Sequence, residues 1–376
     1  MKIRRLGVFL GLLGLFSCSK EQISPQPEPQ EAEQILIVGE DFEAVYSSLY
    51  QPQTGAFETQ NLTANLALPL DYLVQRTYQN DLSFFSFEGG AFSLFRQNMI
   101  TGSSSSYPDF YINTTERSII WGADQGQNIY LAYFTPLGSS NLSLLRMNLQ
   151  GEIQEEMAIE FGVQEVYPPL LQDDYLLVGY RSGNGNYKIG VMQLGSFQFL
   201  GTLDLGTTGS PAYFITAANQ LGVLLNSTGQ TPTIQVYDLS SLEFLFADEV
   251  EVNQFFEPGP VQAELLENKL YYYFAYAQPS PVIDGPAQFS LDSQTNRLLD
   301  VASLRQQLEA DRGLQLVFTA KGIGQSNPPQ FFLGYGFQTT DSTIEGGVVI
   351  LDAQGNVLAQ RSLPYIPTAL ISRAAN

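Results

Sequence analysis

The 376-residue sequence predicts an all-β protein, namely a β-propeller of six or seven four-stranded blades, with seven the preferred number. Three observations predict it: a strand pattern that recurs every 47 to 59 residues, short apolar runs bounded by turn residues, and enough such units to close a ring. A propeller blade is a four-stranded repeat of about 40–50 residues, which is close to the observed period.

The recurring strand contains a small residue followed by tyrosine. The copies are Ala132-Tyr133, Gly179-Tyr180, Ala275-Tyr276 and Gly334-Tyr335. Tyr133 and Tyr180 are 47 residues apart, and Tyr180 and Tyr276 are 96 apart, with residues 221–226 where a copy without tyrosine is expected. The last step, of 59 residues, requires an insertion.

Each copy follows a polar turn and precedes further apolar runs that end in Gly, Asn, Asp or Ser clusters, as in antiparallel meanders. Five such units cover residues 115–364. Residues 82–95 and 45–49 indicate additional, less complete blades nearer the N-terminus. Residues 368–372 are expected to add a strand to the first blade and close the ring, because an open ring leaves strand edges unpaired.

One segment, residues 301–309, has the pattern of a helix. Leu304 and Leu308 are four residues apart and so share one face, with polar residues elsewhere. This helix explains much of the 59-residue step. The Ser-rich residues 101–106 are expected to form a long loop between strands.

Two other all-β architectures fit less well. A β-solenoid has coils of about 20–30 residues, shorter than this period. A pair of β-sandwiches does not explain five similar units in phase. The sequence lacks the Trp-Asp pairs of WD40 blades, a full sialidase Asp-box and the tryptophan docking motifs of quinoprotein propellers.

The N-terminus predicts export and lipidation. Lys2, Arg4 and Arg5 precede eleven residues without a polar side chain, residues 6–16, as in a signal peptide. Residues 15–18 end in Cys18 and resemble the lipobox of bacterial lipoproteins, in which this cysteine becomes the acylated N-terminus. With the repeats, the chain resembles Bacteroidota outer-membrane lipoproteins with a β-propeller body. The alternative is a plain secretory signal with an incidental cysteine.

The expected organisation is a signal peptide at residues 1–17, a lipidated Cys18 with a Pro-, Glu- and Gln-rich tether to residue 34, and a propeller over residues 35–376. The resemblance implies a location in the bacterial cell envelope, on the outer membrane. It leaves open whether the body faces the periplasm or the outside.

Composition excludes several functions. The sequence contains no histidine, which excludes His-dependent triads and His-ligated zinc, and its single cysteine excludes an intrachain disulfide. The net charge is −21, from 17 Lys+Arg and 38 Asp+Glu, and it becomes −24 once three basic residues leave with the signal peptide. Nucleic acid is therefore not an expected partner.

Five residues are candidates for ligand binding: Tyr180, Arg181, Tyr273, Tyr276 and Tyr335. Tyrosines on equivalent strands could ring a sugar or peptide, and Arg181 has no arginine counterpart in the other copies. The alternative is packing between blades, where Gly or Ala permits close approach and Tyr fills the gap. The aromatic run at residues 271–276 is likewise either an exposed platform or a strand buried on both faces.

No catalytic residue, metal site or cofactor is predicted. The adjacent acid pairs Asp173-Asp174, Glu155-Glu156 and Glu40-Asp41 lie in or beside predicted turns, and neighbours on a strand point to opposite faces. No calcium-loop pattern occurs, although a Ca²⁺ ion in the channel stays open.

The sequence thus favours a non-enzymatic binding or scaffold module, held to the membrane by its lipid, for a protein partner or a polysaccharide. Two alternatives stay open. One is a polysaccharide-acting enzyme that uses Asp or Glu with Tyr or Arg in the channel. The other is an accessory subunit of an outer-membrane transport or secretion assembly.

Overall fold

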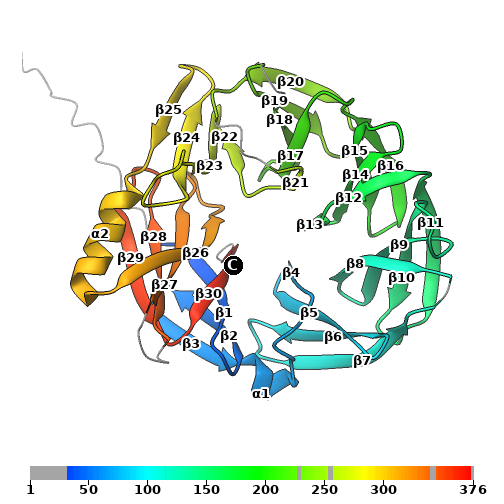
Figure 1. Ribbon diagram of the computed structural model, residues 1–376, viewed down its shortest axis with the longest axis horizontal. Coiled ribbons are helices and arrows are strands. Elements are labelled where there is room, and N and C mark those ends of the chain that lie inside the picture. Colours follow the sequence, from blue (N-terminus) through cyan, green and yellow to red (C-terminus); the bar gives the residue numbers. More distant parts are fainter. Residues whose placement is uncertain (1–31, 115, 227–229, 253–256, 339–343, 374–376) are drawn as a thin grey trace, which may run out of the picture. The chain divides into compact units, whose positions relative to one another are not determined.

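A computed structural model describes residues 32–114, 116–226, 230–252, 257–338 and 344–373. These residues form seven antiparallel sheets that follow one another around a ring (Figure 1). The protein is therefore an all-β, seven-bladed propeller, and both the predicted fold class and the preferred blade number are confirmed. Cys18 and the predicted signal peptide lie outside the described residues.

The first four blades each begin with a strand at the ring centre and end with one at the outer side. Blade 1 is β30 (Ile366–Arg373), β1 (Gln34–Glu40), β2 (Val45–Gln51) and β3 (Ala56–Asn61). Blade 2 is β4 (Val74–Tyr78), β5 (Asp81–Glu88), β6 (Ala91–Asn98) and β7 (Ser104–Ile112). Blade 3 is β8 (Ser118–Gln125), β9 (Asn128–Phe134), β10 (Leu142–Asn148) and β11 (Ile153–Glu160). Blade 4 is β12 (Val163–Val166) and β13 (Leu170–Gln172), both paired with β14 (Tyr175–Ser182), then β15 (Tyr187–Gln193) and β16 (Gln198–Asp204).

The remaining blades follow the same order. Blade 5 is β17 (Ser210–Ile215), β18 (Gln220–Asn226), β19 (Thr233–Asp238) and β20 (Phe244–Glu249), with β21 (Gly259–Pro260) parallel to β17 on the inner side. Blade 6 is β22 (Glu264–Leu266), β23 (Lys269–Ala275), β24 (Asp284–Ser290) and β25 (Thr295–Leu298). Blade 7 is β26 (Gln315–Ile323), β27 (Phe331–Gln338), β28 (Gly346–Leu351) and β29 (Val357–Leu363). The helices are α1 (Leu62–Leu66) and α2 (Val301–Arg312).

The ring closes through the C-terminal strand. β30 pairs antiparallel with β1, so the innermost strand of blade 1 comes from the end of the chain. Leu370 lies opposite Ile37 in this pairing, and both side chains are buried. The expected closure by residues 368–372 is confirmed, and it ties the last segment of the propeller to the first.

The core consists of clusters between neighbouring blades. Each of the seven interfaces holds one hydrophobic cluster among the described residues. Side chains alternate between the two faces of the second strand in each blade, so this strand contributes to the clusters with both neighbouring blades. In β14, Val178 and Tyr180 belong to the cluster with blade 3, whereas Leu177 belongs to the cluster with blade 5.

The repeated small–tyrosine pair is a packing device at these interfaces. Tyr133, Tyr180 and Tyr335 are at most 2 % exposed, and each lies in the cluster shared with the preceding blade. The small residue faces the following blade: a Cβ on Gly179 would overlap the hydroxyl of Tyr213 in blade 5. Glycine is required there because the two sheets approach too closely for any side chain.

The aromatic run at residues 271–276 is a strand buried on both faces. Tyr271 and Tyr273 face blade 7, and Tyr272 faces blade 5. Tyr276 lies just beyond the end of β23 and is partly buried. Between the sequence-based alternatives for this run, an exposed platform and a doubly buried strand, the structure shows the second.

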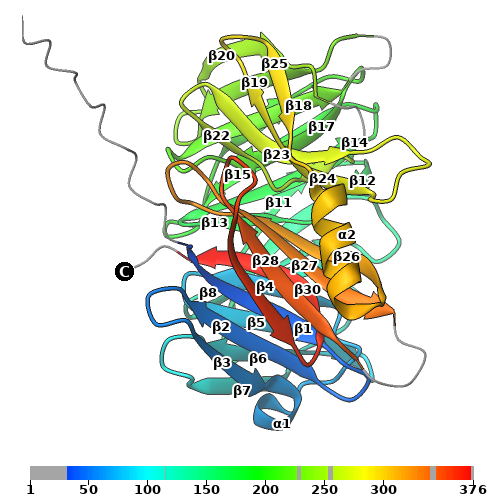
Figure 2. The same ribbon diagram turned by 90° about the vertical axis from the view of Figure 1, so that its left-hand side faces the viewer.

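The predicted helix forms as α2, at the outer side of the ring beside blades 6 and 7 (Figures 1 and 2). Asp300 caps its N-terminus by accepting from the Ser303 backbone N–H at 3.0 Å, and Gly313 ends it in the left-handed conformation with φ 70°. Leu308 is buried and Leu304 packs against the same cluster. The helix thus accounts for the longer last repeat.

Some local predictions were wrong or incomplete. Residues 101–106 are not a continuous loop, because β7 begins at Ser104. Neither the short helix α1 nor the added strand β21 was predicted. Glu33, predicted to lie in the tether, is held by the body: its backbone N–H donates to Gln330 Oε1 at 2.9 Å. Within the described ranges, no helix is both long and apolar enough to cross a membrane.

Candidate functional site: a cavity at the ring centre

The inner strands enclose a cavity of about 1280 Å³. Its lining comes from β4, β21, β26 and β30, from the β23–β24 hairpin, and from the segment between β12 and β13, so six of the seven blades contribute to it. Much of the wall is proline and aromatic: Pro168, Pro169, Pro258, Pro260, Tyr273, Tyr276 and Phe318. A concave, mostly apolar pocket with few polar groups is the usual form of a ligand site.

One side of the cavity carries a connected polar group. Lys321 of β26 forms an ion pair with Asp284 of β24, and its ammonium lies 5.3 Å from the centre of the Tyr273 ring. The Tyr273 hydroxyl lies 2.8 Å from the carbonyl oxygens of both Gly322 and Phe332. Burial raises the pKa of Tyr273, so the hydroxyl stays protonated and orders the wall.

The lining from β4 carries a second basic residue, Arg76. Its Nη1 donates to the carbonyl of Gln75 at 3.1 Å, but its buried Nε has no hydrogen-bond partner among the described residues. Desolvation by burial lowers the pKa of Arg76 to about 10, and the nearby charge of Asp124 opposes this only in part. The guanidinium is therefore still charged at neutral pH, although it is poorly solvated.

One oxygen of Asp124, Oδ2, is hydrogen-bonded to other residues, and its Oδ1 is buried without a partner among the described residues. Its Oδ2 accepts from Arg96 Nη2 at 2.6 Å, from Arg96 Nε at 3.0 Å and from Ser83 Oγ at 2.7 Å. Desolvation by burial raises the pKa of Asp124, and these partners work against that rise. The Arg96–Asp124 pair joins blade 2 to blade 3 behind the cavity wall, and within the described ranges Arg76 forms no ion pair of its own.

Two of the five predicted ligand residues lie at the cavity. Tyr273 and Tyr276 both line it, and burial raises the pKa of each. The Tyr276 hydroxyl is 3.4 Å from the carbonyl oxygen of Leu299, at the edge of hydrogen-bond range. The structure thus brings these two tyrosines together, and ligand contact by them stays a prediction.

The other three do not line the cavity, and Tyr335 lies in a different blade from the consecutive residues Tyr180 and Arg181. Tyr180 is buried between blades 3 and 4, where burial raises its pKa to about 12. Tyr335 is buried between blades 6 and 7. Arg181 donates from Nε to the carbonyl of Gly185 at 3.3 Å and stacks 5.3 Å from the centre of the Tyr187 ring. Their predicted ligand role stays a prediction as well.

The adjacent acid pairs have local partners. Glu155 pairs with Arg146 at 2.8 Å, and Glu156 pairs with Arg117 at 3.2 Å, so the two acids of this pair serve different arginines. Asp174 accepts from the Gly195 backbone N–H at 2.6 Å. In the part of the chain that the structure describes, no three acidic or Cys side chains gather as a metal site would require.

Sequence reasoning missed the residues that give the cavity its charge: Arg76, Glu257, Lys321 and Asp284. One signal was present. The chain has only 17 Lys+Arg, and Arg76 stands inside a short strand-like segment shortly before the incomplete blade predicted at residues 82–95. A cation on the innermost strand of a blade faces either the channel or its wall, so the strand order would have made Arg76 a candidate.

Known proteins resemble the chain in structure alone. No protein-family model matches the chain, and no curated protein matches it. The β-propeller domain of the Trilobed protease from Pyrococcus furiosus aligns with 88 % of this chain and 95 % of that one, at 11 % identity and a TM-score of 0.45.

Two further solved structures are similar to smaller degrees. BamB from Moraxella catarrhalis aligns with 83 % of both chains at 12 % identity and a TM-score of 0.36. TolB from Acinetobacter baumannii aligns with 71 % of this chain and 64 % of that one, at 12 % identity and a TM-score of 0.39. At these identities the likeness concerns the fold alone, so any function has to be argued from this chain's own residues.

Proposed function

We propose that the chain is a non-enzymatic binding module of the bacterial cell envelope, an outer-membrane lipoprotein whose ligand occupies the central cavity. The ligand belongs to a protein partner or to an extracellular polymer. The observation that carries the proposal is the cavity itself, with its proline and tyrosine walls on rigid inner strands. Such walls offer flat apolar surfaces for stacking without needing to move.

The polar groups of the cavity also favour binding. Lys321 and Asp284 are paired with each other, and the Tyr273 hydroxyl is engaged with backbone carbonyls. Groups held in this way orient a ligand and are poorly placed to exchange protons with one. Among the described cavity residues, Arg76 is the cation whose guanidinium still has an unpartnered buried nitrogen.

The proposal is tested by filling the cavity. Ala277 lines it and is exposed, so Ala277→Trp should obstruct the opening without disturbing a blade interface. Ala56→Trp, at an equally exposed position on the outermost strand of blade 1, is the matched control. The full-length protein, solubilised in detergent, is applied to glycan and peptide arrays. We expect binding that Ala277→Trp abolishes and Ala56→Trp retains; equal binding by both variants would place the ligand elsewhere.

The alternative is an enzyme acting on a polysaccharide. One observation favours it: Glu257 and Asp284 both line the cavity, and glycoside hydrolysis needs two carboxylates at one bond. Mass spectrometry of the array ligands after incubation separates the two functions. Shortened oligosaccharides would overturn the binding module in favour of the enzyme.

A role as a subunit of a transport or secretion assembly is tested by a separate experiment. Co-purification from detergent-solubilised membranes would recover stoichiometric partners if the propeller belongs to such an assembly. Loss of those partners in Ala277→Trp would assign their binding to the cavity, whereas retention would assign it to the outer surface of the ring.

Membrane attachment is proposed through Cys18, after cleavage behind residue 17, with the tether leading to the propeller. Cys18→Ala should abolish labelling by a radioactive fatty acid and leave the unprocessed precursor. Unchanged labelling would remove Cys18 from the proposal. Protease treatment of intact cells distinguishes a body that faces the outside from one in the periplasm.

A further inference from the structure

The strongest unexplained feature of the cavity is the charge of Arg76. Arg76 lies on β4, the innermost strand of blade 2, where its side chain is partly buried and lines the cavity. Its Nε is enclosed without a hydrogen-bond partner in the described part of the chain. Among the described residues, no carboxylate lies within 4.0 Å of its guanidinium, and none of the seven ion pairs in this part of the chain includes Arg76.

The charge of Asp124 offsets the desolvation of Arg76 only in part. Asp124 Oδ2 is bound to Arg96 and Ser83, whereas Asp124 Oδ1 is buried without a hydrogen-bond partner among the described residues. Asp81 also acts on Asp124, and it accepts a hydrogen bond from Asn98 Nδ2 at 2.9 Å. A cation withdrawn from water without a partner costs free energy, which a bound anion would return.

The rest of the lining defines what carries that anion. Pro168, Pro260, Tyr273, Tyr276 and Phe318 give the lining its apolar surfaces, and the polar side chains Glu257, Gln262, Gln278, Thr319 and Thr368 lie among them. The whole chain has a net charge of −21, which repels polyanions. A single carboxylate on an apolar group fits both conditions.

We infer that Arg76 is the anion-recognition residue of the cavity and that the ligand is the C-terminal end of a peptide chain with an apolar last residue. The terminal carboxylate pairs with the guanidinium, and the last side chains lie against the prolines and tyrosines. This inference rests on the proposed function, because it names the ligand of the same cavity. Charge-assisted pairs of this kind are stronger than neutral hydrogen bonds.

The first test uses a minimal probe, 4-fluorobenzoate, with the neutral isostere 4-fluorobenzamide as its control. Both are titrated into the full-length detergent-solubilised protein and followed by ¹⁹F NMR. We expect the benzoate to bind and the benzamide to bind roughly 10- to 100-fold more weakly, the range of a charged hydrogen bond. Equal affinity for the two probes would overturn the inference.

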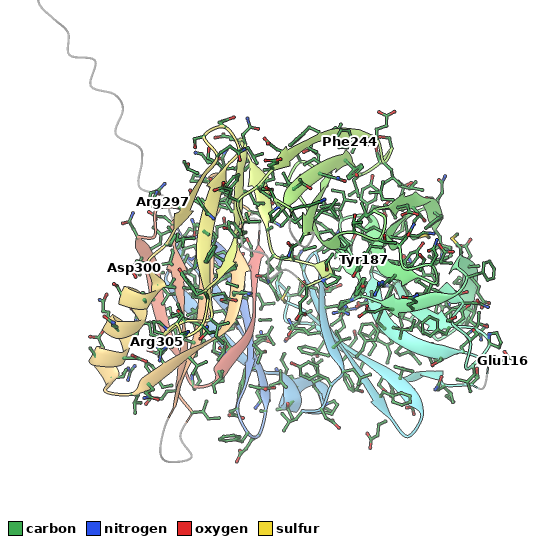
Figure 3. The ribbon with its side chains drawn as sticks, turned by 45° about the horizontal axis from the view of Figure 1, so that its top comes forward. Glu116, Tyr187, Phe244, Arg297, Asp300 and Arg305 are labelled. Atoms are coloured by element: carbon green, nitrogen blue, oxygen red, sulfur yellow. The ribbon has the colours of Figure 1, made fainter. Side chains whose placement is uncertain are left out.

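Variants separate recognition from a structural role. Arg76→Met should lose the benzoate preference, while its midpoint of urea unfolding stays the same or rises, because a partly buried cation without an ion-pair partner has been removed. Arg76→Lys should retain part of the preference. Arg297→Met, at an exposed position on the rim (Figure 3), is the control for loss of a positive charge. A lower midpoint in Arg76→Met with an unchanged benzoate affinity would make Arg76 a structural partner of Asp124 and overturn the inference.

The source of the carboxylate is settled with larger ligands. An acetylated pentapeptide ending in phenylalanine is compared with its C-terminal amide and with trigalacturonate. Binding of the free acid alone supports the inference, and a preference for trigalacturonate overturns it. Binding of a neutral ligand that Ala277→Trp blocks, but Arg76→Met leaves intact, would keep the proposed function and reject only this inference.

Discussion

One ion pair is buried far more deeply than the others among the described residues. Arg96 and Asp124 form a buried pair between blades 2 and 3, with side chains 8 % and 2 % exposed. Arg96→Met leaves the Asp124 carboxylate buried beside Arg76 without its closest partner. We expect the free energy of unfolding at pH 7 to fall by about 3–5 kcal/mol, as when one member of a buried pair is removed.

The pH dependence of that loss follows from Asp124. Burial raises its folded pKa above 3.8, so its contribution to stability is present below the unfolded pKa and is lost as the pH rises through the folded pKa. Without Arg96 this pKa rises further. The deficit of Arg96→Met relative to wild type should therefore shrink from pH 7 to pH 4.5, measured by urea unfolding. The exposed Arg297→Met is the control, and a deficit independent of pH would contradict the prediction.

Residue-scale prediction from sequence was good for packing and poor for the site. The small–tyrosine pair, as in Gly179-Tyr180, repeats because blade interfaces share one geometry. Its regular spacing in the sequence is therefore enough to find it. Arg76 and the Lys321–Asp284 pair each occur once, so the repeat spacing of the sequence cannot reveal them. Their juxtaposition depends on strands from blades 2, 6 and 7, which only the closed ring brings to one cavity.

Among the elements, we expect β30 to matter most for the stability of the fold, because it closes the ring. Leu370 is 3 % exposed, lies opposite Ile37 and packs between blades 7 and 1. Leu370→Ala should lower the free energy of unfolding by about 2–5 kcal/mol. Val357→Ala on β29, where the side chain is 49 % exposed, should change it by less than about 0.5 kcal/mol. Urea unfolding checks both, and a loss no larger than that of the control would deny β30 this role.

The outer strand β20 is the weakest edge of the ring (Figure 3, at Phe244). Phe244, Leu245 and Phe246 are 57 %, 44 % and 36 % exposed, and the strand pairs only with β19 among the described residues. Residues 238–251 contain no lysine or arginine that would protect this edge. The register shift beside Tyr237 is a bulge, which limits pairing with another strand.

We therefore expect weak self-association through β20 once charge repulsion is screened. In 1 M NaCl, where the Debye length is about 3 Å, sedimentation should show a dimer at high concentration that the double substitution Phe244→Lys and Phe246→Lys removes. Phe161→Lys replaces a 72 % exposed aromatic elsewhere and is the control. A wild type that stays monomeric, or an equal effect of the control, would rule out β20 as the contact.

Elements were predictable in proportion to their burial. The second and third strands of each blade are buried on both faces and read as apolar runs, so the sequence located them. Among the innermost strands, β21 and β13 are short and β4 is evenly half-buried, whereas β8, β17, β26 and β30 are longer. β21, β13 and β4 lack the alternation that marks a strand, whereas β26 shows it, so the cavity could be derived from the sequence only in part.

At the scale of the whole molecule, negative charge greatly exceeds positive charge. The chain has 38 acidic against 17 basic residues, and the described residues form seven ion pairs, most of them partly exposed. Exposed pairs contribute about 0–1 kcal/mol each. Folding gathers the excess negative charge onto one compact surface, where self-repulsion opposes the folded state.

Repulsion and ion pairing respond to salt in opposite directions, which makes the balance measurable. Raising NaCl from 0.01 to 0.15 M shortens the Debye length from about 30 to about 8 Å. If repulsion dominates, as the excess of acidic residues implies, the urea midpoint should rise over this range. A falling midpoint would mean that the ion pairs contribute more than the repulsion costs. Sodium sulfate at equal ionic strength is the control, because screening alone predicts the same rise, and any additional rise reports exclusion of sulfate from the protein surface.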